Sequence, residues 1–368
     1  TARTPPTPGA PDFIVERVAL TQFDDSGQAN YRLLAARLSY FNENDDIELT
    51  RPRLVSLQPG QPQLQASSER ARVTNAGETG IRTDPAYSGF RLKKSVFIAN
   101  ANGLYFHSSG LPESSVKANC FRQNQLAGIR TRYGLDDAVI GKNLFFETAL
   151  AAAIIVDQEP GSTTDRLEVI GNRSQGDSTF AVIVGTTDSV FAKNTVDSTL
   201  GTAIFVGGNN VNLEISKNTV TNAGTRGIRF NTAAFGGSAS TGVLVASNVV
   251  DNAGIHGISI DSSAGETTLA TSTIEKNTVT NSGTSGSGDG IRVEDPLASG
   301  ANGGNTIERN TISGSFNHDC HDGSVGAGTA GTANTWTTNT ATTHNVTDLC
   351  FTGAANGADL GGGAIVTG

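Results

Sequence analysis

Two groups of polar and aromatic residues occupy a fixed place in a repeated pattern of this chain. The first group contains Tyr105, His107, Arg130, Arg132 and Asp157. An arginine can pair with the carboxylate of an acidic sugar, and a histidine or tyrosine can accept or donate a proton. This combination would suit β-elimination on an acidic polysaccharide, so we regard these five as candidate catalytic residues.

The second group has similar charges without an aromatic ring. It contains Arg229, Asp261, Arg292 and Glu294, which we regard as candidate binding residues. A ladder of surface ion pairs is the alternative interpretation of both groups, because alternating Arg and Asp arise easily on stacked strands. No repeated Asp-x-Asp cluster lies in these rows, which argues against a hydrolase. Asp157 is the only carboxylate in the first group, whereas a calcium-dependent lyase would need several clustered carboxylates.

The segment richest in metal-binding side chains is residues 317–323, where two His and two Asp surround Cys320. A single local segment rarely supplies a complete coordination sphere, so we expect no metal and no cofactor. Cys320 follows Asn310 by ten residues, and Cys350 follows Asn339 by eleven, about one repeat later. Equivalent positions in adjacent repeats lie within disulfide range, which favours a Cys320–Cys350 disulfide over a metal site.

These groups belong to a repeat that spans most of the chain. A small residue followed by an apolar one recurs every 22–33 residues, at positions 80, 103, 128, 153, 181, 203, 227, 257 and 290. Such a period, with short β segments and no helical periodicity, predicts a parallel β-solenoid. Asparagines recur with it, and we expect each side-chain amide to bond to its copy in the next coil. They are Asn119, Asn143, Asn172, Asn194, Asn218, Asn248, Asn277 and Asn310.

Strand alternation assigns a direction to each position of the repeat. We call the small residue the zero position of the repeat. Counting from it, positions +1 and +3 should face the interior and positions +2 and +4 should face the solvent. Both candidate groups fall in the outward rows. Between them the same rows predict an exposed apolar patch of Ile155, Ile183 and Phe205. Cys120, one position after a ladder asparagine, is predicted to be a buried free thiol.

Over residues 72–350, this pattern resembles the right-handed parallel β-helix proteins of the pectate-lyase-like superfamily, with about nine to eleven coils. That class contains many functions. The segment 328–336 resembles a C-terminal segment of secreted bacterial β-helix proteins, which often carries such a Cys pair. A disulfide implies an oxidising compartment, such as the periplasm or the cell exterior.

The N-terminal part of the sequence differs from the repeat in its composition and in its predicted strand pattern. Residues 1–11 contain four of the eleven prolines and predict a linker, and residues 12–78 predict antiparallel β-hairpins. Several stretches resemble, in order, the LptC family of periplasmic lipopolysaccharide-export proteins. They are residues 11–16, 20–27, 31–38, 45–52 and 66–71. The resemblance covers the first half of that family's β-jellyroll.

This resemblance implies a non-enzymatic role, in which an open β-groove shelters lipid acyl chains and passes them along a bridge. It implies lipopolysaccharide and envelope β-bridge proteins as partners, and a membrane anchor ahead of Thr1. The second half of the jellyroll, which in that family docks the next bridge component, is not recognisable in this sequence. The alternative to a lipid-transfer role is therefore that these strands merely cap the solenoid. We expect the strands to continue into the solenoid without a flexible linker. A natural fusion and an engineered chimera both fit this arrangement.

Composition agrees with an all-β protein. The 368 residues include 44 Gly, and the Gly-rich residues 351–368 predict a tail. The net charge of −9 without a basic block argues against a nucleic-acid partner. The longest apolar run, residues 149–156, is far shorter than the roughly 20 residues of a membrane-spanning helix. The sequence thus predicts a periplasmic or extracellular protein of the lipopolysaccharide-export type. Polysaccharide lyase or hydrolase and carbohydrate-binding or structural solenoid are the alternatives.

Overall fold

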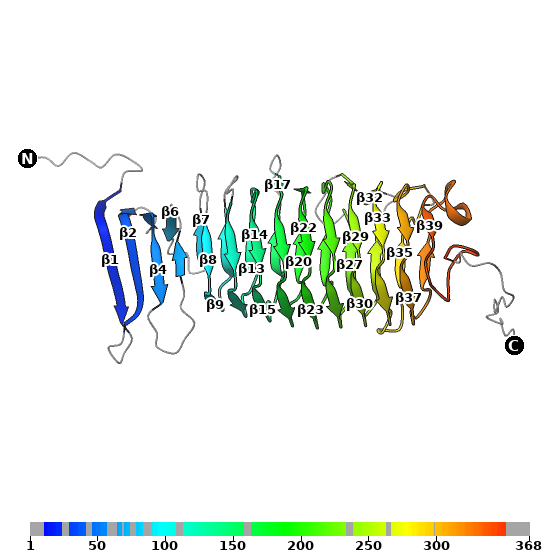
Figure 1. Ribbon diagram of the computed structural model, residues 1–368, viewed down its shortest axis with the longest axis horizontal. Coiled ribbons are helices and arrows are strands. Elements are labelled where there is room, and N and C mark those ends of the chain that lie inside the picture. Colours follow the sequence, from blue (N-terminus) through cyan, green and yellow to red (C-terminus); the bar gives the residue numbers. More distant parts are fainter. Residues whose placement is uncertain are drawn as a thin grey trace, which may run out of the picture.

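The computed structural model shows a row of stacked β coils with antiparallel strands at its N-terminal end (Figure 1). It describes residues 11–23, 29–41, 46–56, 65–67, 70–73, 79–83, 90–107, 113–157, 163–232, 238–262, 266–297 and 299–350. Residues 1–10 of the predicted linker over residues 1–11, and the predicted tail over residues 351–368, lie outside these ranges. In the described part, no helix is both long and apolar enough to cross a membrane.

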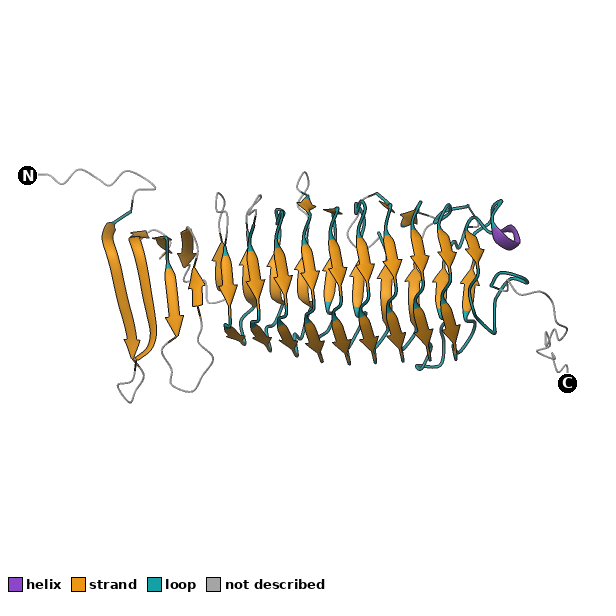
Figure 2. Cartoon of the chain, in the orientation of Figure 1, coloured by secondary structure: helices purple, strands orange, loops and turns teal. Residues whose placement is uncertain are grey.

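Three parallel sheets run along the solenoid, and each coil adds one strand to a sheet (Figure 2). The first sheet consists of β7 (Thr79–Thr83), β10 (Asn102–Phe106), β13 (Ala127–Thr131), β16 (Ala152–Val156), β20 (Ala181–Ile183), β24 (Ile204–Val206), β27 (Arg226–Phe230), β31 (His256–Ile260), β35 (Ile291–Val293) and β38 (Cys320–Asp322).

The second sheet consists of β8 (Arg91–Lys93), β11 (Ser115–Lys117), β14 (Val139–Gly141), β18 (Glu168–Ile170), β22 (Val190–Ala192), β25 (Glu214–Ser216), β29 (Leu244–Ala246), β33 (Thr273–Glu275), β36 (Thr306–Glu308) and β39 (Thr335–Thr337). The third consists of β9 (Val96–Ile98), β12 (Cys120–Arg122), β15 (Leu144–Phe146), β19 (Arg173–Gln175), β23 (Thr195–Asp197), β26 (Thr219–Thr221), β30 (Val249–Asp251), β34 (Thr278–Thr280) and β37 (Thr311–Ser313).

Five shorter elements of the described residues lie outside the three sheets. They are the pair β17 (Thr164–Asp165) and β21 (Thr186–Thr187), the pair β28 (Ser240–Thr241) and β32 (Leu269–Ala270), and the 3-10 helix η1 (Thr329–Gly331). The prediction of an all-β solenoid is therefore confirmed.

The interior is filled by the positions that alternation predicts. At +1, Leu104, Ile129 and Ile154 are completely buried, as is Phe106 at +3. The third sheet adds stacked phenylalanines, whose ring centroids lie 5.0 Å apart for Phe97–Phe121 and 5.1 Å for Phe121–Phe145. Because one coil cannot bury its own inner face, this column forms only when coils stack.

One part of the predicted register is wrong. In the coil containing β20, Ala181 pairs with Ile154, so it holds position +1 rather than the zero position. The zero position belongs to Phe180, which is fully buried. Consequently Val182 faces outward and Ile183 is buried, the reverse of the prediction. The expectation of a small residue at the zero position failed because this coil accommodates an aromatic ring there.

The recurring asparagines form a continuous ladder, as predicted. Asn194 illustrates the unit: its backbone N–H and its Nδ2 both donate to Oδ1 of Asn218, at 3.0 and 2.9 Å. The same two hydrogen bonds link each ladder asparagine to the next, from Asn119 through Asn310 to the last acceptor, Asn339. Each buried turn therefore satisfies its polar groups through the neighbouring coil.

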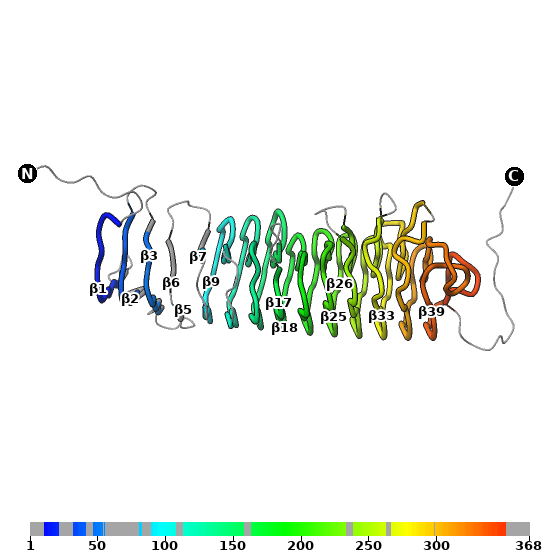
Figure 3. Tube along the Cα trace, turned by 90° about the horizontal axis from the view of Figure 1, so that it is seen from above, coloured from blue at the N-terminus to red at the C-terminus, as the bar shows by residue number. Residues whose placement is uncertain are grey.

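The N-terminal strands are continuous with the solenoid. They are β1 (Phe13–Phe23), β2 (Ala29–Phe41), β3 (Asp46–Thr50), β4 (Arg53–Ser56), β5 (Gln65–Ser67) and β6 (Arg70–Val73). One half of β2 pairs with β3 and the other half with β4. The order β3–β6–β7 leads into the first sheet, and β4–β5–β8 into the second. Figure 3 shows this row from above.

The pairing of β5 and β6 with the first coil supports the prediction that the strands continue into the solenoid. Both of these strand pairings are antiparallel, whereas the coils pair with one another in parallel. The connection between β1 and β2, residues 24–28, lies outside the described residues.

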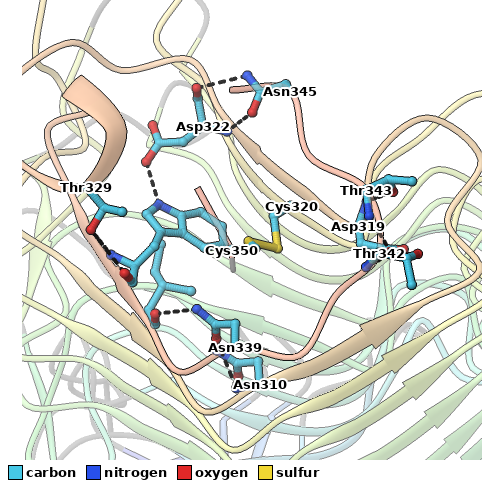
Figure 4. The surroundings of a disulfide bond; sticks show 12 residues. Asn310, Asp319, Cys320, Asp322, Thr329, Asn339, Thr342, Thr343, Asn345 and Cys350 are labelled. Atoms are coloured by element: carbon cyan, nitrogen blue, oxygen red, sulfur yellow. Dashed lines mark hydrogen bonds between the residues drawn. A yellow bond between two sulfur atoms is a disulfide. The ribbon is translucent and has the colours of Figure 1, made fainter. Parts of the chain in front are cut away.

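The C-terminal coil is held by the predicted disulfide between Cys320 and Cys350, whose Cα atoms lie 6.4 Å apart (Figure 4). Nearby, Oδ2 of Asp319 accepts hydrogen bonds from the N–H and hydroxyl of Thr342. Cys120 is a free thiol, as predicted, but it is only partly buried. It lies in the outward row of the third sheet, next to Leu144, because the inward position of this strand belongs to the fully buried Phe121.

Candidate functional site

The first candidate group lies on the outer face of the first sheet, near the N-terminal end of the solenoid. Nη2 of Arg130 lies 2.9 Å from Oδ2 of Asp157 in the next coil. Tyr105 is only 9% exposed, and two guanidinium groups lie close to its ring, that of Arg82 at 5.8 Å and that of Arg130 at 5.6 Å. The guanidinium of Arg132 lies 5.8 Å from the ring of Tyr133 instead.

The arrangement around His107 determines its tautomer. Nη2 of Arg82 lies 2.9 Å from Nδ1 of His107. A guanidinium can only donate, so this nitrogen accepts and the neutral ring carries its proton on Nε2. The ring meets Tyr105 and Tyr133 edge-on, with centroids 5.3 and 5.1 Å apart. In this state Nε2 of His107 can donate a hydrogen bond to a ligand rather than accept one.

The second candidate group lies near the other end of the same face and is more deeply buried. Oδ2 of Asp261 accepts from Nε of Arg229 at 2.6 Å and lies 3.3 Å from Nη2 of Arg226. Arg292 donates to Oε1 of Glu294 at 2.9 Å. The four predicted residues therefore form two ion pairs, and Arg226 joins the first of them.

Sequence reasoning missed a further row next to these residues. This row occupies the position one before the zero position of the repeat. It begins with Arg226 and its pairing partner His256 in the next coil, and it continues with Asp289 and His318 in the two coils after that. His321 continues the +2 row, opposite Arg292. Counting one position backward along the same repeat would have revealed this row.

Asp289 joins the members of this row to Arg292. Its side chain is fully buried, and Nη1 of Arg292 donates to Oδ2 at 2.7 Å. Oδ1 lies 3.2 Å from Nδ1 of His318, and Oδ2 lies 3.8 Å from Nδ1 of His321. The backbone N–H of Asp289 itself donates to Nδ1 of His256 at 3.0 Å.

Burial also determines the charges in this cluster. Burial, with the nearby charges of Arg292 and Arg226, lowers the pKa of His256 to about 4. Burial and Arg292 likewise lower the pKa of His321 to about 4. Burial alone would raise the pKa of Asp289, but the hydrogen bond from Arg292 and nearby charges hold it below its ordinary value. At neutral pH both histidines are therefore uncharged and Asp289 is ionised.

An apolar strip connects the two groups along the sheet. It consists of Ile155, Val182 and Phe205, all partly exposed in the +2 row, with Val182 in place of the predicted Ile183. At its end the guanidinium of Arg229 lies 5.3 Å from the Phe205 ring. The outward face thus carries charged groups at both ends and apolar side chains between them.

Comparison with known proteins divides the chain at the boundary between the N-terminal strands and the solenoid. Residues 1–79 match the family described as lipopolysaccharide-assembly, LptC-related. Residues 79–236 match the family described as right handed beta helix region. The chain is thus similar to LptC-related proteins over its N-terminal segment, and a right-handed parallel β-helix follows that segment. The resemblances stated from the sequence are thereby confirmed, and the strands show that the β-helix continues to β39.

Solved structures similar to the β-helix include several enzymes. An exopolygalacturonase from Thermotoga maritima has 14% identity and a TM-score of 0.48, with 58% of this chain and 51% of that chain covered. An alpha-1,3-glucanase from Streptomyces thermodiastaticus has 13% identity and a TM-score of 0.43, covering 91% and 98%. The periplasmic alginate epimerase AlgG has 11% identity and a TM-score of 0.41, covering 67% and 66%.

These similarities say nothing about the activity of the β-helix, because both identity and TM-score are low. The chain spans about half the length of the exopolygalacturonase. Among curated protein sequences none matches the chain.

Proposed function

We propose that the β-helix binds an anionic polysaccharide along the outer face of its first sheet. The observation that carries this proposal is the placement of guanidinium groups at both ends of one row of outward positions, joined by the apolar strip. Arginine pairs well with carboxylates, and apolar side chains can contact the faces of sugar rings. The disulfide and the LptC-related segment support a periplasmic or extracellular setting.

The size of the face favours a polymer over a small anion. Four coil-to-coil steps separate Arg130 on β13 from Arg229 on β27. At roughly 4.8 Å per step, the two guanidinium groups lie about 19 Å apart along the axis. Only a ligand of several sugar units can reach both ends and cover Val182 and Phe205 between them.

Binding to immobilised polygalacturonate and alginate, with a neutral glucan for comparison, tests this proposal. We expect Arg130→Gln with Arg229→Gln to weaken binding at least tenfold, because each charged hydrogen bond contributes about 1.5–3 kcal/mol. Added salt should weaken wild-type binding as well. Arg226 remains beside Asp261 in this variant, which preserves the fold.

Arg309→Ala is the matched control, since Arg309 is exposed and pairs with Glu275 and Glu308 of the second sheet. Equal binding of the neutral glucan, or unchanged binding by the double variant, would contradict the proposal.

For catalysis on this polymer we propose the first candidate group, comprising Tyr105, His107, Arg130, Arg132 and Asp157. Arg130 and Arg132 would pair with uronate carboxylates, and the N–H at Nε2 of His107 would donate a hydrogen bond to the leaving oxygen. Tyr105, held between two guanidinium groups, would act in its deprotonated form: it would accept the proton from the sugar carbon and pass it to the leaving oxygen as the C–O bond breaks and the C=C bond forms.

Formation of unsaturated product from a panel of uronic-acid polymers is the assay for this proposal. Tyr105→Phe and His107→Ala should each lower turnover at least ~100-fold. No product from any polymer, or turnover that survives His107→Ala and Arg130→Ala, would exclude this site while leaving polysaccharide binding untouched.

The LptC-related segment supports a second function, attachment to another envelope protein. Among the described strands, β1 pairs only with β2, so its other edge offers unpaired backbone groups. Phe13, Ile14, Val15 and Leu20 on this strand are 43–53% exposed. We propose that this edge pairs with a strand of an envelope β-bridge protein.

Transfer of lipopolysaccharide stays a prediction for this segment. The β-helix itself is filled from its first two coils, where Phe90, Leu92 and Phe106 are at most 3% exposed. A continuous lipid path through the β-helix interior therefore has no support.

Copurification with a β-bridge protein of jellyroll type tests the β1 edge. Phe13→Lys with Val15→Lys should abolish copurification, because charged side chains on an edge strand oppose pairing with another strand. Leu200→Lys, an exposed position far along the β-helix, should leave it unchanged. Copurification that survives the double variant would contradict the proposed edge.

A further inference from the structure

The two histidines of β38 and its preceding turn face a carboxylate from the coil before. Asp289 comes from the turn that precedes β35, whereas His318 and His321 belong to the next coil. One ligand atom from each of the three residues lies within 4.8 Å of the others. The sequence segment around Cys320 supplied only two of these donors, and the third lies 29 residues earlier in the chain.

The separations between these atoms suit metal coordination. Bonds of about 2.0–2.1 Å at tetrahedral angles place neighbouring ligand atoms roughly 3.3 Å apart. Nδ1 of His318 lies 3.2 Å, and Nδ1 of His321 3.8 Å, from the nearest carboxylate oxygen of Asp289. In addition, Nδ1 of His321 is buried and has no hydrogen-bond partner among the described residues. A buried nitrogen of this kind needs a partner.

Surrounding groups can support such a site. Arg292 donates a hydrogen bond to Oδ2 of Asp289 at 2.7 Å, in the way that outer partners orient metal-binding carboxylates. The positive charges of Arg226, Arg229 and Arg292 would oppose a cation by themselves. Three carboxylates in the same network balance them, namely Asp261, Asp289 and Glu294. A divalent ion would therefore meet no net positive charge from these six side chains.

We propose that Asp289, His318 and His321 bind a divalent transition-metal ion, with Zn²⁺ the first choice for two imidazoles and one carboxylate. Three protein ligands leave a coordination position open, which is typical of catalytic rather than structural zinc sites. The side chain of His318 is 38% exposed, so a carboxylate or hydroxyl oxygen from solution can reach the site. This proposal goes beyond polysaccharide binding and does not depend on it.

Titration of the chelator-treated full chain with Co²⁺, followed by visible absorption, tests the site. We expect a single Co²⁺ per chain, with d–d bands that Zn²⁺ abolishes by displacement. His318→Ala and His321→Ala should each lower the affinity at least roughly tenfold. His107→Ala, which removes an imidazole at the other end of the sheet, should leave binding unchanged.

Thermal melting of each variant separates loss of the site from loss of the fold, and the partly exposed His318 is the safer position to change. Absence of the d–d bands in wild type, or their persistence in both His318→Ala and His321→Ala, would overturn the proposal. In that case the cluster is a metal-free hydrogen-bond network. Polymer binding by chelator-treated protein is measured in parallel, so that failure of the metal site and failure of polysaccharide binding remain distinguishable.

Discussion

Asp261 and Asp289 are carboxylates that the β-helix buries on its outer face, each beside an arginine of a neighbouring position. Removal of a partner from such a pair leaves an uncompensated charge, so these residues depend strongly on one another. Asp261 was predictable because it lies in an outward row of the repeat. Asp289 was missed because it lies outside the alternating rows, in the turn before the strand.

A third buried carboxylate gives a pH-dependent prediction. Asp177 is fully buried and accepts hydrogen bonds from the N–H of Thr148 at 2.7 Å and the hydroxyl of Ser174 at 2.6 Å. Burial raises its pKa, and these bonds only partly offset the effect. Between the unfolded value of about 3.9 and the raised folded value, the folded state holds more protons. Stability attributable to Asp177 therefore decreases as pH rises through this window.

Asp177→Asn removes this ionisation. The melting temperature of wild type relative to Asp177→Asn should fall as pH increases from about 4, until the folded carboxyl is fully ionised. Asp188→Asn, at an exposed position, serves as the control. A difference between wild type and Asp177→Asn that is constant from pH 4 to pH 8 would show that Asp177 titrates normally.

At the scale of the element, the asparagine ladder holds the turns of successive coils together. Asn218 is fully buried, accepts two bonds from Asn194, and donates to the backbone oxygen of Phe191 at 2.9 Å. The ladder was predictable because stacking translates one coil onto the next, which brings equal positions of the repeat within bonding distance.

Asn218→Ala should destabilise the β-helix by about 2–4 kcal/mol, because it leaves at least two buried polar groups without partners. Thr219→Ala changes the exposed neighbouring residue and should cost less than about 0.5 kcal/mol. Denaturant unfolding and amide hydrogen exchange in β22 and β26 measure the difference. Equal stability of the two variants would mean that water or a shifted turn replaces the ladder bonds.

At the scale of the whole molecule, the N-terminal segment covers the end of the β-helix. β5 and β6 pair with β8 and β7, which would otherwise be open edges of two parallel sheets. Open edges of this kind promote pairing between chains. These pairings attach the N-terminal strands, in a segment similar to another family, to the first coil of the β-helix.

A chain that lacks residues 11–73 should therefore associate at concentrations where the full chain does not. Light scattering coupled to size-exclusion chromatography measures this, with the full chain as control. A shortened chain that remains monomeric and melts at the same temperature would show that the first coil needs no cover.

The sequence alone determined the solenoid, its asparagine ladder, its inward rows except in the coil of β20, and the Cys320–Cys350 disulfide. In a stacked repeat, position within the repeat corresponds to position in space, so a periodic pattern contains this information. Tertiary structure decided which side chains meet across coils, because coil lengths differ and turns depart from strand alternation. That is why the exposed Val182, and the meeting of Asp289 with His318 and His321, became visible only in the folded chain.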